Sequence, residues 1–212
     1  EQYLEYDLTS IVYKLSQPVK PKLAMLWSLP LEQGSGGLQA ALQGNAQPFA
    51  IYQQLQQTYE LQTLDTTVDR IPADISTLLV IHPANFGDAT QYAIDQFVLR
   101  GGHAIVFVDP FSELSGNQSQ GQGQFGGGEN ATSDLKALFT AWGVDYDVSK
   151  VVVDAELAQQ VQFGGGGVPR VVDYIAWLRA TPANFNQDDP ATGKLQLLNI
   201  ATAGALKPHM GA

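Results

Sequence analysis

Three short apolar runs constrain the fold of this chain more than any other feature. Each run is followed within two residues by a polar residue or a proline. They are residues 23–27 in KLAMLWSLP, 78–81 in STLLVIHP and 104–108 in HAIVFVDP. Each run is continuously apolar, whereas a strand with one solvated face would alternate between apolar and polar residues. Continuous runs of this length are typical of parallel strands that are covered on both faces of a sheet.

The segments between these runs have the spacing of helices. Residues 48–59 predict a helix with Pro48 near its first position, and residues 60–64 predict a short strand after it. Residues 87–102 predict a second helix, with Asp88 as N-cap and a pair of glycines as its stop. Alternating strands and helices favour parallel α/β units. We therefore predict a doubly wound, mostly parallel, flavodoxin-like sheet over residues 22–110.

The two ends of the chain are less uniform. Residues 3–18 predict a first helix that ends at Pro18. Residues 112–132 are rich in Gly, Gln, Ser and Asn, which is typical of a mobile surface loop, and Ser133 is the predicted N-cap of a helix after it. The pattern then weakens, with short strands expected at 151–153 and 195–200. We predict one α/β domain over 1–212, with a core at about 22–145 and a less regular α+β extension at about 146–205.

Composition excludes several classes of function. The net charge is −10 and the sequence pI is about 4.5, which argues against binding nucleic acid or anionic lipid, because both require clustered Lys and Arg. The chain has no Cys, which removes disulfides, thiolate nucleophiles and cysteine–metal sites. No stretch is apolar over the roughly 18 residues of a membrane span. We expect the chain to be a piece of a longer protein.

Polar residues follow each predicted strand of the parallel sheet. Ser28 follows the first strand, Asp65 the second, His82 the third and Asp109 the fourth, and Asn85 lies just beyond His82. Ligands of open parallel sheets bind beyond the carboxyl ends of the strands. The sequence therefore predicts these five residues as a candidate ligand-binding rim.

Two alternatives to a purely structural rim stay open. The chain could be a small-molecule or glycan-binding module that uses Ser28, His82, Asn85 and Asp109. It could also be a hydrolase in which His82 and Asp109 act together, which requires the histidine to reach a hydroxyl or a carboxylate. However, the sequence has no G-x-S-x-G, no H-x-x-x-H and no G-x-x-x-x-G-K-[ST] motif. We therefore assign no catalytic residue, no metal site and no cofactor.

Several stretches together resemble a known family. IPADISTLLVIHP, DATQYAIDQFVLRGGHAIVFVDPF, SDLKALFTAWGVDYD and ATAGAL occur in the order found in the extracytoplasmic region of GldG-type auxiliary proteins of ABC transporters, also called gliding-motility-associated ABC transporter proteins. The resemblance runs from about Tyr3 to Ala205, and its most specific block is residues 71–111.

The resemblance implies a fold, a location and partners. The fold would be similar to that of class I glutamine amidotransferases and of a domain of an intraflagellar transport protein. The enzymes of that class use a Cys nucleophile, which this chain lacks, so the activity does not carry over. The implied role is a non-enzymatic periplasmic domain that binds a partner or substrate, beside an ABC permease and ATPase. The domain would belong to a membrane-anchored protein whose membrane spans lie outside this chain. Neither the transported substrate nor the oligomeric state follows from the sequence.

Overall fold

The computed structural model describes residues 4–16, 19–34, 41–117, 131–163 and 170–209. The chain divides into two compact units, unit 1 (Glu1–Phe107) and unit 2 (Val108–Ala212). Each is described by itself below. The expected single domain over 1–212 stays a prediction. Most of the low-complexity segment expected as a loop, residues 118–130, lies outside the described residues.

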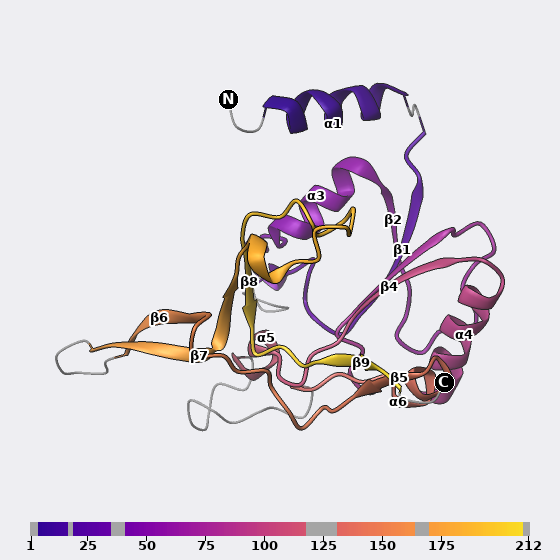
Figure 1. The fold of residues 1–212 in the computed structure, drawn as a ribbon. Helices are drawn as coiled ribbons and strands as arrows, with labels where there is room; N and C mark the ends of the chain where they lie inside the picture. The colour runs from indigo at the N-terminus through magenta and orange to yellow at the C-terminus, as the bar shows by residue number, and fades with distance from the viewer. Residues whose placement is uncertain (1–3, 17–18, 35–40, 118–130, 164–169, 210–212) are drawn as a thin grey trace. The chain divides into compact units, whose positions relative to one another are not determined.

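Unit 1 is built around a four-stranded parallel sheet (Figure 1). Its spatial order is β2-β1-β3-β4, which is the order of the first four strands of a flavodoxin-like sheet. This confirms the predicted α/β class with a parallel sheet. The strands are β1 (Lys22–Trp27), β2 (Glu60–Thr63), β3 (Thr77–Ile81) and β4 (His103–Phe107).

Helix α3 (Ala50–Thr58) covers part of one sheet face. Leu23 and Met25 of β1 form a buried cluster there with Leu79 of β3. Packed against this cluster from the helix and from the residue after it are Tyr52, Leu55 and Tyr59. The apolar side of this helix therefore packs on the cluster formed by β1 and β3.

Helix α4 (Asp88–Leu99) leads from β3 to β4. Since crossovers between parallel strands are right-handed, and the sheet grows in opposite directions from β1 to β2 and from β3 to β4, α3 and α4 lie on opposite faces. Ile94 and Phe97 of α4 are fully buried. Position 102 requires a glycine, because a Cβ there would come within 2.4 Å of the Phe97 ring.

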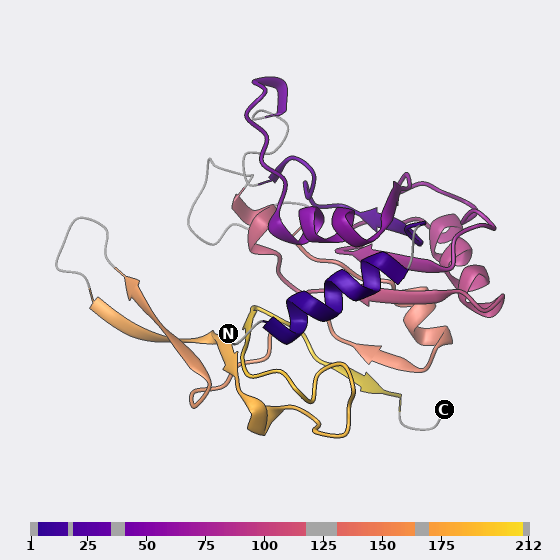
Figure 2. The ribbon, with the colours of Figure 1, turned by 90° about the horizontal axis from the view of Figure 1, so that it is seen from above.

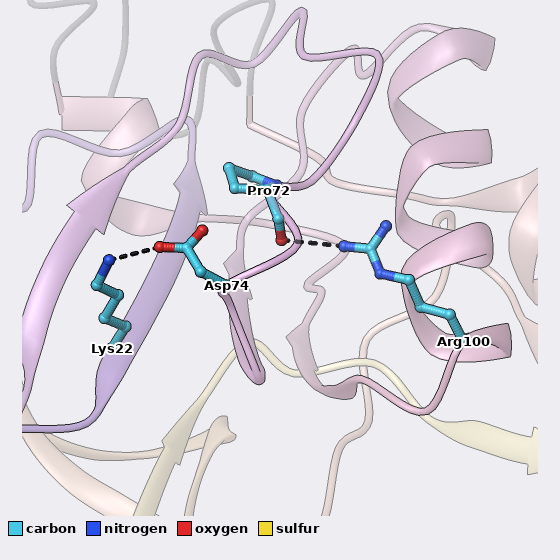
Figure 3. Close-up of polar contacts among 4 residues, drawn as sticks. All are labelled: Lys22, Pro72, Asp74 and Arg100. Atoms are coloured by element: carbon cyan, nitrogen blue, oxygen red, sulfur yellow. Dashed lines mark hydrogen bonds and ion pairs between the residues drawn. The ribbon is translucent and has the colours of Figure 1, made fainter.

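The amino ends of the strands are joined by polar contacts (Figure 3). The ammonium group of Lys22 pairs with the Asp74 carboxylate at 2.5 Å. The guanidinium group of Arg100 donates to the carbonyl oxygens of Ile71 and Pro72 at 2.7 and 3.1 Å. These contacts fix the segment before β3 to β1 and to the end of α4, at the edge opposite the candidate rim.

Helix α1 (Leu4–Ser16) precedes the sheet in the sequence, as predicted. Its apolar residues recur at helical spacing, yet their side chains are exposed. These residues are Leu4, Leu8, Ile11, Val12 and Leu15.

Unit 2 combines short helices with antiparallel strands. Helices α5 (Glu113–Asn117) and α6 (Lys136–Ala141) come first, and β5 (Val144–Tyr146) pairs with β9 (Leu206–Pro208). A second sheet has the order β6-β7-β8. Its strands are β6 (Ala158–Phe163), β7 (Arg170–Ala180) and β8 (Leu198–Ala201).

Strands β6 and β7 form a ribbon that projects from the rest of unit 2 (Figure 2). Strand β8 pairs only with the last four residues of β7, Trp177 to Ala180. The Trp177 indole N–H donates to the Glu113 carboxylate at 2.6 Å, which holds the base of the ribbon to α5. Farther out, Val171, Val172 and Ile175 are exposed.

Several local predictions were wrong. Residues 113–117, expected within the low-complexity loop, form helix α5. Asp88 is the first residue of α4 and Gly87 is its N-cap. Ser133 lies three residues before α6, whose N-cap is Leu135. Residues 151–153 form no strand, because the Val152 N–H donates to the Ala203 carbonyl without a regular ladder. The strand expected at 195–200 begins later, as β8.

Candidate functional site

Ser28 lies directly after β1, at the carboxyl edge of the parallel sheet. Its N–H donates to the Ile81 carbonyl at 3.4 Å, and its hydroxyl donates to the Ala84 carbonyl, also at 3.4 Å. Both contacts are long for hydrogen bonds of their type. Ser28 therefore joins the loop after β1 to the loop after β3.

His82 and Asn85 give the loop after β3 an unusual backbone. Both adopt left-handed conformations, with φ of 50° for His82 and 60° for Asn85. Such values are uncommon for residues with a Cβ, although Asn and His adopt them more often than most. His82 is 1% exposed, and its backbone N–H donates to the Phe107 backbone carbonyl at 2.9 Å. Strained backbone of this kind accumulates at binding and catalytic sites.

Asp65 lies two residues beyond β2 and shapes its own turn. Its carboxylate accepts hydrogen bonds from the Thr67 hydroxyl at 2.5 Å and from the Thr67 N–H at 2.8 Å. These bonds lower the pKa of Asp65 below its usual value. The same loop reaches the start of α4, where the Thr90 hydroxyl donates to the Thr66 carbonyl at 3.0 Å.

The structure thus places four of the five predicted residues at one edge of unit 1, as the strand ends indicated. Asp109 is the exception, because it belongs to unit 2. Its backbone is paired there with Ser133. The combination of His82 with Asp109 required for a hydrolase stays an untested prediction, as does the binding role of the rim.

Sequence reasoning missed a polar cluster in unit 2. The Tyr146 hydroxyl oxygen is buried and has no hydrogen-bond partner among the residues that the structure describes. Burial, together with the charges of Asp109 and Asp134, raises the pKa of Tyr146 far above its usual value. Burial also raises the pKa of Asp134. These residues are distant in sequence, so no motif could have identified the cluster.

The rim brings several polar groups to the carboxyl edge of the parallel sheet. It offers a hydroxyl, a carboxylate of lowered pKa, a buried imidazole and an amide, on a backbone held by hydrogen bonds. Within the described ranges, no group of three or more His, Asp or Glu side chains could hold a metal ion.

Comparison with known families identifies the chain over most of its length. The family model ABC_transp_aux, described as ABC-type uncharacterized transport system, matches residues 20–212. No curated protein and no solved structure matched. In the parts of the chain that the structure describes, no helix has the length and apolarity needed to cross a membrane. Since the match covers the parallel sheet and all of unit 2, the chain belongs to this family of auxiliary components of ABC-type transport systems.

Proposed function

We propose that this chain is a non-enzymatic, periplasmic domain that binds a protein partner or the transported substrate within an ABC-type transport system. The family match carries this proposal. The partners that it implies are the permease and the ATPase of the same system. Membership of the GldG type and an amidotransferase-like fold are part of the proposal, and both rest on the sequence resemblance.

Exposed apolar residues on the β6–β7 ribbon support partner binding. Val171 is 59% exposed, and Val172 and Ile175 are also exposed on the same strand. Among the described residues, the distal part of the ribbon consists of β6 and β7 alone, and two-stranded ribbons are marginally stable in water on their own. Apolar residues gathered on such an element favour burial against another protein.

Site-specific crosslinking in the membranes of the source organism tests the partner. A photo-crosslinking residue replaces Val171 in the full-length protein, and mass spectrometry identifies what it captures. The matched control replaces Glu156, an exposed polar residue of the same unit. We expect permease peptides at position 171 and fewer at position 156. Recovery of neither permease nor ATPase from any position would refute the proposal.

A second candidate function is a small-molecule or glycan-binding module at the rim. The left-handed backbone of His82 and Asn85 favours it. Replacing Asn85 with Gly removes the amide and keeps the backbone conformation accessible. Mono- and disaccharides should then raise the melting temperature of the wild-type chain and of the Ser149→Ala control, but not that of Asn85→Gly. An equal response of all three chains would exclude this site.

A further inference from the structure

One face of the parallel sheet is covered at β1 and β2 but exposed at β4. The strand register places Met25 beside Leu79 and Leu79 beside Ile105, so the three side chains share a face. Met25 is fully buried, whereas Ile105 is 53% exposed. Phe107, two residues farther along β4, is 56% exposed on the same face. Ile105 and Phe107 are called the β4 strip below.

The opposite face of the sheet has no such gap. Leu78 and Val80 point to that face and are fully buried, as is Phe97 of α4, which covers it. Parallel sheets bury both of their faces. The β4 strip is therefore the part of this sheet that lacks the cover expected for its type.

Helix α1 has an apolar side that no other element covers among the described residues. Leu8, Ile11 and Val12 lie on one side of the helix together with Leu4 and Leu15, and all five side chains are exposed. An amphipathic helix of a globular protein turns this side to a core. Unit 1 thus contains an apolar helix face without a sheet and an apolar sheet strip without a helix.

We infer that α1 of the same chain docks its apolar side on the β4 strip, beside α3. The dimensions agree, because a helix of 13 residues is about 20 Å long and a strand of five residues spans about 17 Å. In this position α1 would run antiparallel to the strands before entering β1, as α4 does before β4. Helix α1 would then cover the β4 strip in the same way that α4 covers the opposite face of the sheet.

The connection between α1 and β1 is long enough for this arrangement. Five residues separate Ser16 from Lys22, and they reach about 20 Å when extended. Reaching β4 from β1 requires two strand spacings of about 5 Å and one layer spacing of about 10 Å, or about 14 Å in all. An intramolecular contact is therefore within reach without a second copy of the chain.

Thiol labelling of the full chain tests the inference, since the sequence contains no Cys to interfere. Phe107→Cys is labelled with a maleimide in three backgrounds, namely wild type, Ile11→Glu and Thr9→Glu. Residues 9 and 11 lie about 160° apart around the helix, so Thr9→Glu is the matched control. We expect Ile11→Glu to speed labelling at least about tenfold and Thr9→Glu to leave the rate nearly unchanged.

A disulfide test identifies the occupant of the strip. Ile11→Cys combined with Ile105→Cys should close within one chain upon oxidation, whereas Thr9→Cys with Ile105→Cys should not. A crosslinked dimer would assign the strip to a second copy and overturn the inference. Fast labelling of Phe107→Cys in every background, or protection that Ile11→Glu leaves intact, would overturn it as well. Both assays use the isolated chain, so their outcome does not depend on the proposed transport role.

Discussion

Ser133 is hydrogen-bonded to the backbone of Asp109 through both its own N–H and its side-chain hydroxyl. The Asp109 N–H donates to the Ser133 hydroxyl oxygen at 2.9 Å, and the Asp109 carbonyl accepts from the Ser133 N–H at 3.0 Å. The Ser133 hydroxyl also donates to the same carbonyl at 3.3 Å. The two residues lie on either side of the low-complexity segment, so this pair closes its base.

Replacing Ser133 with Ala should destabilise unit 2. Ser133 is 1% exposed, and the substitution leaves the Asp109 N–H without its acceptor. We expect a loss of about 2 kcal/mol in the free energy of unfolding, measured by urea denaturation. Ser149→Ala, in an exposed turn, is the control and should have a smaller effect. Equal losses of unfolding free energy for Ser133→Ala and Ser149→Ala would show that the hydrogen bonds between Ser133 and Asp109 do not stabilise unit 2 more than an exposed turn does.

Replacing Tyr146 with Phe should stabilise the chain. The Tyr146 hydroxyl is buried without a partner among the described residues, so its removal relieves a desolvation cost of about 1 kcal/mol. The ring stays packed edge-on against Phe139, with centroids 6.0 Å apart. Thermal unfolding measures the gain, and Tyr92→Phe, at an exposed position, should give none. A lower melting temperature for Tyr146→Phe would contradict this account.

The stability gained in Asp134→Asn should depend on pH. Burial raises the pKa of Asp134 in the folded state, so the unfolded chain releases the proton at lower pH than the folded chain does. Below the unfolded pKa both states are protonated and no penalty exists. As the pH rises through the folded pKa, ionisation favours unfolding.

We therefore expect Asp134→Asn to be more stable than wild type at pH 7, with the difference shrinking toward pH 3. Denaturant melts at several pH values measure it. Asp188→Asn, in an exposed turn, is the control. A difference that is constant across the pH range would show that charge at Asp134 is not its cause.

Gly102 and Phe97 should show energetic coupling. A Cβ at Gly102 would overlap the Phe97 ring, so Gly102→Ala should cost about 1–3 kcal/mol through overpacking. In a Phe97→Leu background the ring is gone and the same substitution should cost less. A double-mutant cycle from urea denaturation gives the coupling energy. If the losses in unfolding free energy from Gly102→Ala and Phe97→Leu are additive, the Cβ at position 102 does not clash with the Phe97 ring.

The parallel sheet was predictable because its signal is local. The apolar runs that became β1, β3 and β4 are short, continuous and bounded by turn residues. The same pattern predicts burial, which is confirmed for β1 and β3 but wrong for β4, where Ile105 and Phe107 are exposed. The position of Ser28, Asp65 and His82 beyond the strand ends follows from the same reasoning.

The features that were missed depend on distant partners. Ser133 has the residue type of an N-cap, but its hydroxyl bonds to Asp109 across the low-complexity segment. Residues 151–153 have the composition of a strand, but nothing pairs with them in a ladder. His adopts the left-handed conformation more often than most residues, but this preference is too weak to predict it at His82 from the sequence.

The central position of β1 determines when unit 1 can be completed during synthesis. Strand β1 is made first, yet it lies between β2 and β3, and its two hydrogen-bonding edges need residues 60–63 and 77–81. Its most apolar residues therefore leave the ribosome long before either neighbour exists. Parallel pairings between distant segments form slowly, so the newborn chain must keep β1 from aggregating until Ile81 has emerged.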